Sequence, residues 1–353
     1  MPVDMNKQID FIAYIQRMLV EGNFTATYKY ALLHALADIC IERPLSADPN
    51  SEIEITFNEI VEKLIGLYWQ HALPFMGARH GCEEGVILQQ SSRKQASIIT
   101  SLNECHNNNI SNINQLKRSQ YWDSLRKDTL KTLKEGPLWR LQILAKTEQC
   151  FLYPHNKRQK HITLHPGIAY CFRRFYDLVV HLSRHAWIQK IQSYPENSSL
   201  LGSQTQLDDF LFGVNRQALA KARPLLEEIQ HGKCFYCQKP LNTQTEVDHF
   251  IPFVKYSNDL GHNFVVAHHS CNNSKRDNLG AIIHRDRWYE QNIIENNELI
   301  GNELNPYFNC DAPRSEAVTS WAYQIAIKNN AQLWLDNKHF ESASGLASGL
   351  LMV

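Results

Sequence analysis

Apolar residues recur at three- and four-residue steps along much of the first half of the chain, which is the spacing of one face of an α-helix. The pattern predicts two helices within residues 7–43, the first ending at Gly22 and the second stopping before Pro44, and a third helix over residues 56–71. Residues 89–102, 115–135 and 166–192 also have helical spacing. In the last of these stretches the aromatic residues follow a buried helical face, which favours a core over a base-stacking surface.

Other segments have different patterns. Residues 139–153 and 263–267 alternate between apolar and polar positions and predict strands. Residues 45–54 predict a loop, and residues 194–203, which contain Pro, Asn and Ser, predict a linker. Helical spacing returns at residues 217–230, 279–299 and 317–335, and the Ser- and Gly-rich tail at 342–349 is expected to fray. Gln90, Arg93 and Lys94 fit either a nucleic-acid contact or the exposed side of a helix.

Charge is distributed unevenly along the chain. The 36 basic and 36 acidic residues cancel, and a hydrophobic content of 43% is ordinary for a globular protein of 353 residues. Residues 112–190, however, contain fifteen Lys and Arg against five Asp and Glu, a net charge of +10. A segment of this charge suits a phosphate backbone, but Lys127, Lys131 and Lys134 lie at helical spacing and fit a solvated helix face equally well.

The nine cysteines argue against a disulfide framework, because their number is odd and several are isolated in the sequence. The first ten residues include acids and no apolar leader, and no run approaches eighteen apolar residues. We therefore expect a protein of the reducing cytosol that does not span a membrane.

The most informative segment is residues 234–275. Two residues separate Cys234 from Cys237 and His268 from Cys271, so a pair of turns could bring four ligands around one Zn²⁺. Between the two pairs lie Asp248 and His249, followed closely by Pro252. Hydrolysis of a phosphodiester requires a cation at the phosphate and a base for the attacking water, and an adjacent carboxylate and imidazole can supply both functions. Either motif alone is weak evidence, since a CxxC pair or an Asp-His dipeptide often has no function.

The complete order of parts resembles the HNH endonuclease family, whose ββα-metal core contains CxxC, Asp-His followed by Pro, Asn before an apolar residue, and CxxCN with Lys. The resemblance covers about residues 216–280. It departs from many relatives at His268, where they have Cys, and this difference is mild because imidazole also binds zinc. Asn272 stands where the name-giving members have His, as in a variant subgroup.

The resemblance implies a role for each residue of the motif. His249 would be the general base, Asp248 and Asn272 would hold a catalytic Mg²⁺ or Mn²⁺, and a structural Zn²⁺ would replace the core that so small a module cannot build. Asn263 would fix the loop that carries the base, and Lys275 would stabilise the transition state or leaving group. We also expect Arg276 to contact the phosphate backbone of the nucleic acid and Glu246 to assist the metal or hold a water molecule. The residues expected to hold the zinc are Cys234, Cys237, His268 and Cys271.

Together these inferences predict an α-rich α+β protein. We expect a helical domain over residues 1–193 that regulates the enzyme or binds DNA, a linker with a short helix over 194–215, an HNH module over 216–280, and C-terminal helices with a tail over 281–353. The layout also resembles restriction-type and anti-phage defence nucleases, including the accessory nuclease of Zorya-type systems, which implies defence-system protein partners. The oligomeric state is not predicted.

Two other functions were weighed against a DNA endonuclease or nickase. A non-catalytic, zinc-stabilised binding or scaffold protein needs only the four zinc ligands, so the presence of Asp248, His249 and Asn272 argues against it. A secreted colicin-like toxin shares the nuclease core. The cysteine usage and the missing export or receptor-binding sequence argue against that interpretation.

Overall fold

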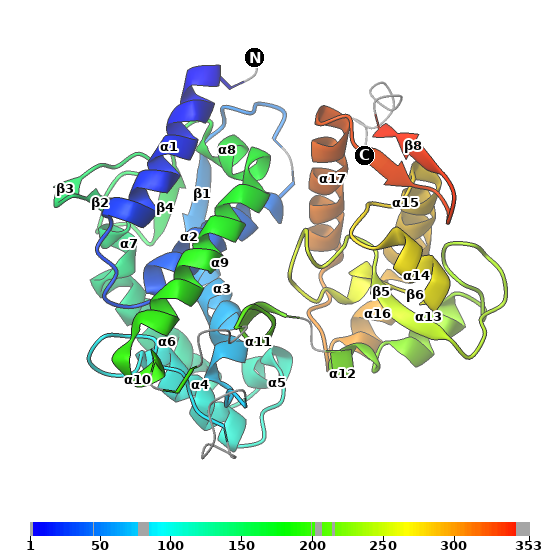
Figure 1. Cartoon of the computed structure of the whole chain (residues 1–353), viewed down its shortest axis with the longest axis horizontal. Helices are drawn as coiled ribbons and strands as arrows, with labels where there is room; N and C mark the ends of the chain where they lie inside the picture. The colour runs from blue at the N-terminus through cyan, green and yellow to red at the C-terminus, as the bar shows by residue number, and fades with distance from the viewer. Residues whose placement is uncertain are drawn as a thin grey trace. The chain divides into compact units, whose positions relative to one another are not determined.

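The computed structural model describes residues 3–44, 46–76, 85–198, 200–201, 207–213 and 216–343. The Cα positions divide the chain into two compact units, residues 1–41 with 46–213 and residues 42–45 with 214–353. Both units are mainly helical with small two-stranded antiparallel sheets, which confirms the predicted α-rich α+β class (Figure 1).

The N-terminal unit is built around α2 (Tyr28–Ile41), which is buried along its whole length from Lys29 to Ile41. A helix that is apolar on all sides must be covered on all sides, and α2 packs against α3 (Phe57–Trp69), α8 (Ile168–Arg174) and α9 (Tyr176–Ser193) (Figure 1). α1 (Met5–Glu21) ends at Gly22, as predicted, and contacts α8 and α9.

A local sequence signal fixes where α3 begins. The Thr56 hydroxyl accepts a hydrogen bond from the Glu59 backbone N–H, and the Glu59 carboxylate accepts one from the Thr56 backbone N–H. This capping box satisfies two donors at the start of α3. Thr56 also ends β1 (Ile53–Thr56), which pairs with β4 (His161–Leu164), so part of the predicted 45–54 loop is a strand.

Three predicted segments of this unit differ from the structure. The helix expected over 89–102 is α4 (Ser97–Asn107), and Gln90 lies in the core, where its Oε1 accepts from Thr27 Oγ1 and Trp187 Nε1. Gln90 is therefore neither a nucleic-acid contact nor an exposed helical residue. The helix expected over 166–192 is interrupted at Phe175, between α8 and α9. The 139–153 strand is instead a helical turn followed by a short hairpin.

The remaining elements of this region are η1 (Gln70–Ala72), α5 (Ile113–Lys117), α6 (Trp122–Glu135), α7 (Pro137–Arg140), β2 (Ile143–Leu144) and β3 (Thr147–Glu148).

The predicted linker at 194–203 belongs to the packed N-terminal unit where it is described. α10 (Pro195–Ser198) follows α9, and the buried Asn197 side chain donates to the carbonyls of Gln89 and Ile191. α11 (Asp208–Phe212) places Phe212 against the rings of His71 and Trp187. Residues 199 and 202–206 of this stretch, and residues 344–349 of the predicted frayed tail, lie outside the described residues.

The C-terminal unit contains a two-stranded sheet with helices packed around it. A buried cluster that includes Leu226, Phe264, Val266, Ile300 and Leu304 fills the space beside this sheet. The hairpin of β7 and β8 replaces the end of the helix predicted over 317–335. The elements are α12 (Arg216–Leu219), α13 (Arg223–Ile229), β5 (Thr245–His249), η2 (Gly261–Asn263), β6 (Phe264–His268), α14 (His269–Lys275), α15 (Ile282–Trp288), η3 (Tyr289–Glu295), α16 (Asn297–Leu304), α17 (Ala312–Lys328), β7 (Gln332–Trp334) and β8 (Phe340–Ser342).

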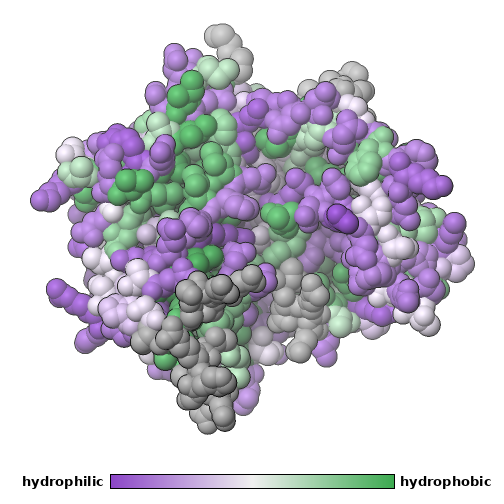
Figure 2. Space-filling model, viewed as in Figure 1, coloured by the Kyte–Doolittle hydropathy of each residue, from purple (hydrophilic) through white to green (hydrophobic). Residues whose placement is uncertain are grey.

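The surface of the N-terminal unit has an apolar area over α1 (Figure 2). Met5 and Ile9 of α1 are exposed, as are Leu178 and Leu182 of α9. No helix among the described residues is both long and apolar enough to cross a membrane.

Candidate functional site

The candidate site is built on β5, β6 and α14, a ββα arrangement (Figure 1). The strands pair antiparallel, with Thr245 opposite His268 and His249 opposite Phe264. Since side chains alternate along a strand, Glu246 and Asp248 point to one face of β5 and Val247 and His249 to the other. The first face is covered by α14.

The four predicted zinc ligands come together. The side-chain donor atoms of Cys234, Cys237, His268 and Cys271 all lie within 4.8 Å of one another. The Cys237 Sγ lies 3.3 Å from His268 Nδ1, and His268 Nε2 lies 3.0 Å from the Pro240 carbonyl oxygen. If Nε2 donates its proton to that carbonyl, the Nδ1 lone pair is directed into the cluster, which is how metal-binding histidines are oriented.

The electrostatics of the cluster also fit a metal that binds thiolates. The pKa of Cys234 is lowered to about 4, first by the Cys271 thiol and then by backbone N–H groups that include those of Cys237 and His268. The same pairing raises the pKa of Cys271. Three sulfur donors and one imidazole at this spacing match tetrahedral Zn²⁺, and the residues therefore fit the structural zinc that the sequence predicted.

Asp248 lies at the centre of a buried cluster of polar side chains. Its Oδ2 accepts from Lys275 Nζ at 2.9 Å and from the Tyr236 hydroxyl at 2.5 Å. Lys275 Nζ also donates to the His249 carbonyl at 3.0 Å, and the lysine is completely buried. Lys275 is thus buried beneath the strand and paired with Asp248, and the transition-state or leaving-group role that the resemblance implies stays a prediction.

His249 lies on the opposite face, near the end of β5. Its Nε2 lies 2.7 Å from Asp259 Oδ1, and the side chain keeps 8% of its surface exposed. Phe253 and Phe264 pack against the imidazole ring. Burial among aromatic rings with one carboxylate partner fixes the orientation of the ring.

Asn263 holds the loop that follows His249. Its Oδ1 accepts from the Ile251 N–H at 2.8 Å, its Nδ2 donates to the Ile251 carbonyl at 3.0 Å, and its own carbonyl accepts from the Phe250 N–H. These three hydrogen bonds tie the backbone just beyond His249 to Asn263 at the start of β6.

A second polar group lies between β5 and the exposed side of α14. Glu246 accepts from Asn272 Nδ2 at 2.7 Å and lies 2.8 Å from His269 Nδ1. Asn273 Nδ2 lies 2.7 Å from His269 Nε2. Glu246 is therefore a direct neighbour of Asn272. Arg276 is exposed, and its Nε donates to the Asn273 carbonyl at the end of α14.

Sequence reasoning missed several of these contacts. Asp259 lies ten positions from His249 and Tyr236 lies twelve from Asp248, and nothing in the sequence around Asp259 marks it. An earlier signal was available for Tyr236, since it lies inside the CxxC loop whose position the zinc ligands fix.

Comparison with known proteins finds one family match in the N-terminal part of the chain and a second, different match in the C-terminal part. A family described as "Domain of unknown function (DUF8808)" matches residues 8–210, which is more than half of the chain. The chain belongs to the DUF8808 family. In this DUF8808 protein residues 234–278 match the HNH endonuclease family, and this match includes all four Cys/His ligands of the cluster. The resemblance stated from the sequence is confirmed for that segment. No curated protein and no solved structure matches the chain significantly.

Proposed function

We propose that this protein is a metal-dependent DNA endonuclease or nickase in which His249 is the general base. The observation that carries the proposal is the His249–Asp259 pair at the end of β5, in the same ββα arrangement as a Cys/His cluster suited to zinc. Zinc binding by itself needs neither residue. An imidazole oriented by a carboxylate at the Asp-His step of the motif is what a general base requires, and zinc binding alone does not account for it.

The Asp259 contact gives His249 a defined protonation pattern. A carboxylate accepts hydrogen bonds only, so the neutral imidazole carries its proton on Nε2 and its lone pair on Nδ1. Nδ1 is then the atom that takes a proton from the attacking water, and the Asp259 charge stabilises the imidazolium that forms. This division of labour follows the base-and-orienting-group arrangement of other hydrolases.

The proposed ligands of the catalytic cation are Asp248 and Asn272, which lie on the same side of β5 and α14. Asp248 engages its Oδ2 with Lys275 and Tyr236, which leaves Oδ1 for a cation. Asn272 donates through Nδ2 to Glu246, so its Oδ1 is the atom free to coordinate. Carboxylate and amide oxygens suit Mg²⁺ or Mn²⁺, which when bound would polarise the phosphate and stabilise its developing charge.

Lys275 is proposed to act as a positioning residue. Its ammonium group joins the Asp248 carboxylate to the His249 carbonyl, so one buried charge holds both the proposed metal ligand and the backbone of the residue that carries the base. This role is proposed in place of the transition-state or leaving-group stabilisation implied by the resemblance, because a completely buried lysine would have to break both bonds to reach a bound strand.

The test is cleavage of supercoiled plasmid by purified, zinc-loaded protein with Mg²⁺ or Mn²⁺, scored for open-circle and linear products. His249→Ala should abolish cleavage and leave the zinc content unchanged. His339→Ala is the matched control, since His339 also pairs with a carboxylate in the same unit but is 65% exposed on the β7–β8 hairpin. Wild-type activity in His249→Ala would overturn the mechanism, and so would cleavage that persists in EDTA. A role in restriction or anti-phage defence, with its partner proteins, is a further proposal that rests on the sequence resemblance alone.

A further inference from the structure

The N-terminal unit contains a basic cavity that the nuclease site does not use. It has a volume of about 890 Å³ and lies between the end of α6, α7, the β2–β3 hairpin and the loop that precedes β4. This size is within the range of pockets that hold small organic ligands. Its basic lining residues are Lys134, Arg140, Lys157 and Arg158.

The charges around the cavity are unbalanced. Glu135 and Glu148 are the acids of the lining, so four cations against two carboxylates give a net charge of +2. In the part of the chain that the structure describes, none of the four cations forms an ion pair with a carboxylate. They come from three separate segments, and their convergence on one concavity concentrates a positive field there.

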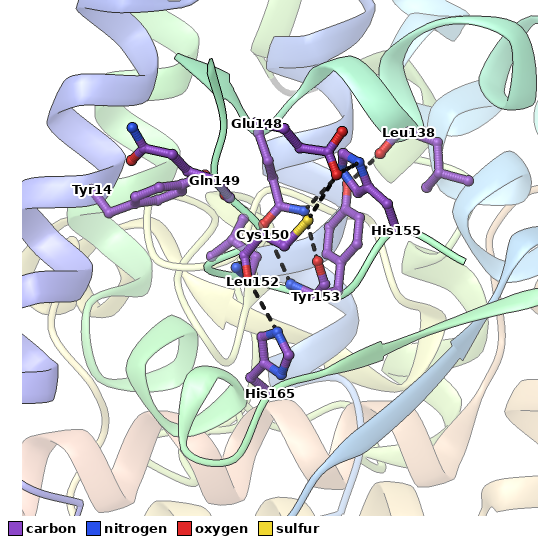
Figure 3. A network of polar contacts seen from close by, with 10 residues as sticks. Tyr14, Leu138, Glu148, Gln149, Cys150, Leu152, Tyr153, His155 and His165 are labelled. Atoms are coloured by element: carbon purple, nitrogen blue, oxygen red, sulfur yellow. Dashed lines mark hydrogen bonds and ion pairs between the residues drawn. The ribbon is translucent and has the colours of Figure 1, made fainter. Parts of the chain in front are cut away.

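A polar network that includes the lining residues Glu148 and His155 borders the cavity (Figure 3). Glu148 Oε1 lies 2.8 Å from His155 Nδ1 and 3.3 Å from Cys150 Sγ, and Figure 3 shows the three side chains pointing toward one another. The cross-strand pair of Ile143 and Glu148 presents both residues to the cavity, and Trp139 packs edge-on against His155 beside them. The lining therefore combines cationic side chains with two apolar residues.

The same three residues could also suggest a metal site, because their donor atoms lie within 4.8 Å of one another. The Gln142 side chain argues against it. Its Oε1 accepts from the Leu152 N–H, which directs Nε2 as a donor toward the Tyr153 carbonyl and toward His155 Nε2. His155 Nε2 must then accept, so the proton of the neutral ring is on Nδ1, bonded to Glu148, and Nδ1 has no lone pair for a metal.

We propose that this cavity binds the phosphate groups of a nucleoside phosphate. Four cations that form no ion pair with a carboxylate among the described residues suit an anion of more than one charge, and the volume exceeds what inorganic phosphate needs. The lining also includes the apolar side chains of Trp139 and Ile143, of which Trp139 is only 7% exposed. The same chemistry is offered by a free nucleotide and by a nucleotide unit of a single strand, and the experiment separates these two sources.

The test is equilibrium binding to the zinc-loaded full-length protein without added divalent cation, so that no strand is cleaved. The probes are ATP, a fluorescent oligothymidylate and inorganic phosphate. The variant is Lys157→Glu/Arg158→Glu, which changes two exposed residues of the lining. Lys127→Glu/Lys131→Glu is the matched control, because it makes the same charge change at exposed positions of α6 outside the lining.

The proposal predicts that the lining variant weakens binding of ATP or of the oligothymidylate at least about tenfold, whereas the α6 control weakens it much less. Loss of ATP binding would identify a free nucleotide as the source, and a loss confined to the oligothymidylate would identify a strand. An equal loss in both variants would show diffuse attraction and overturn the proposal, as would a wild-type protein that binds neither probe or binds inorganic phosphate as tightly as ATP. No step of this assay depends on His249, so its failure is separate from a failure of the nuclease proposal.

Discussion

Replacing Lys275 by Met should destabilise the C-terminal unit. The substitution keeps most of the apolar stem but removes an ammonium group that is bonded to Asp248 at 2.9 Å and to the His249 carbonyl at 3.0 Å. The Asp248 carboxylate, itself only 9% exposed, would keep the Tyr236 hydroxyl as a partner but lose its counter-charge. Removing one member of a buried ion pair costs about 3–5 kcal/mol, a large fraction of the stability of an ordinary domain.

The free energy of unfolding is measured by urea denaturation at fixed excess zinc, with Lys221→Met as the control at an exposed lysine of the same unit. The double variant Asp248→Asn/Lys275→Met removes both charges, so it should be less destabilised than the sum of the two single variants. The contrary result is that Lys275→Met unfolds at the same urea concentration as wild type and still loses cleavage. That result would refute the positioning role of Lys275 and favour its direct action on the transition state or leaving group.

Three further outcomes follow from the site. Cys237→Ser should lower the zinc content from about one ion per chain and lose solubility, as measured by metal analysis and sedimentation, because the cluster replaces part of the core. Asn263→Ala should lower the free energy of unfolding by about 1–3 kcal/mol in urea titrations, since it leaves two buried backbone groups of Ile251 without partners. Asp259→Asn should reduce the cleavage rate at least about tenfold with little loss of stability, because an amide can donate to His249 and stabilise the wrong tautomer. An unchanged rate in Asp259→Asn would remove Asp259 from the mechanism.

The sequence predicted what depends on local spacing. The two Cys/His pairs, the Asp-His step on a strand and the following Asn are encoded within about forty positions, and the resemblance to the order of motifs in a known family implied a role for each of them. The helices α1, α2 and α3 were also predictable, since each has an uninterrupted apolar face and a clear end signal such as Gly22.

What could not be predicted depends on tertiary contacts. Asp259 reaches His249 only because the loop between β5 and β6 folds back over the strand, and loop paths leave no periodic signal. Gln90 has the sequence context of a surface helix, but Thr27 and Trp187 supply its buried partners from distant segments. The helix predicted over 217–230 is interrupted between α12 and α13. Pro224 lies in the first turn of α13, and a proline at that position is a sequence signal for the start of a helix. The β7–β8 hairpin was missed because helical spacing was extended to residue 335.

The most direct test of the central claim is a single-turnover measurement. A labelled DNA duplex is mixed with saturating zinc-loaded protein and Mg²⁺, and the cleavage rate of His249→Ala is compared with that of wild type at equal occupancy. The account predicts a rate at least about a hundredfold lower in the variant, because a positioned general base contributes about that much. Equal rates would contradict it and assign the chemistry to a group other than His249.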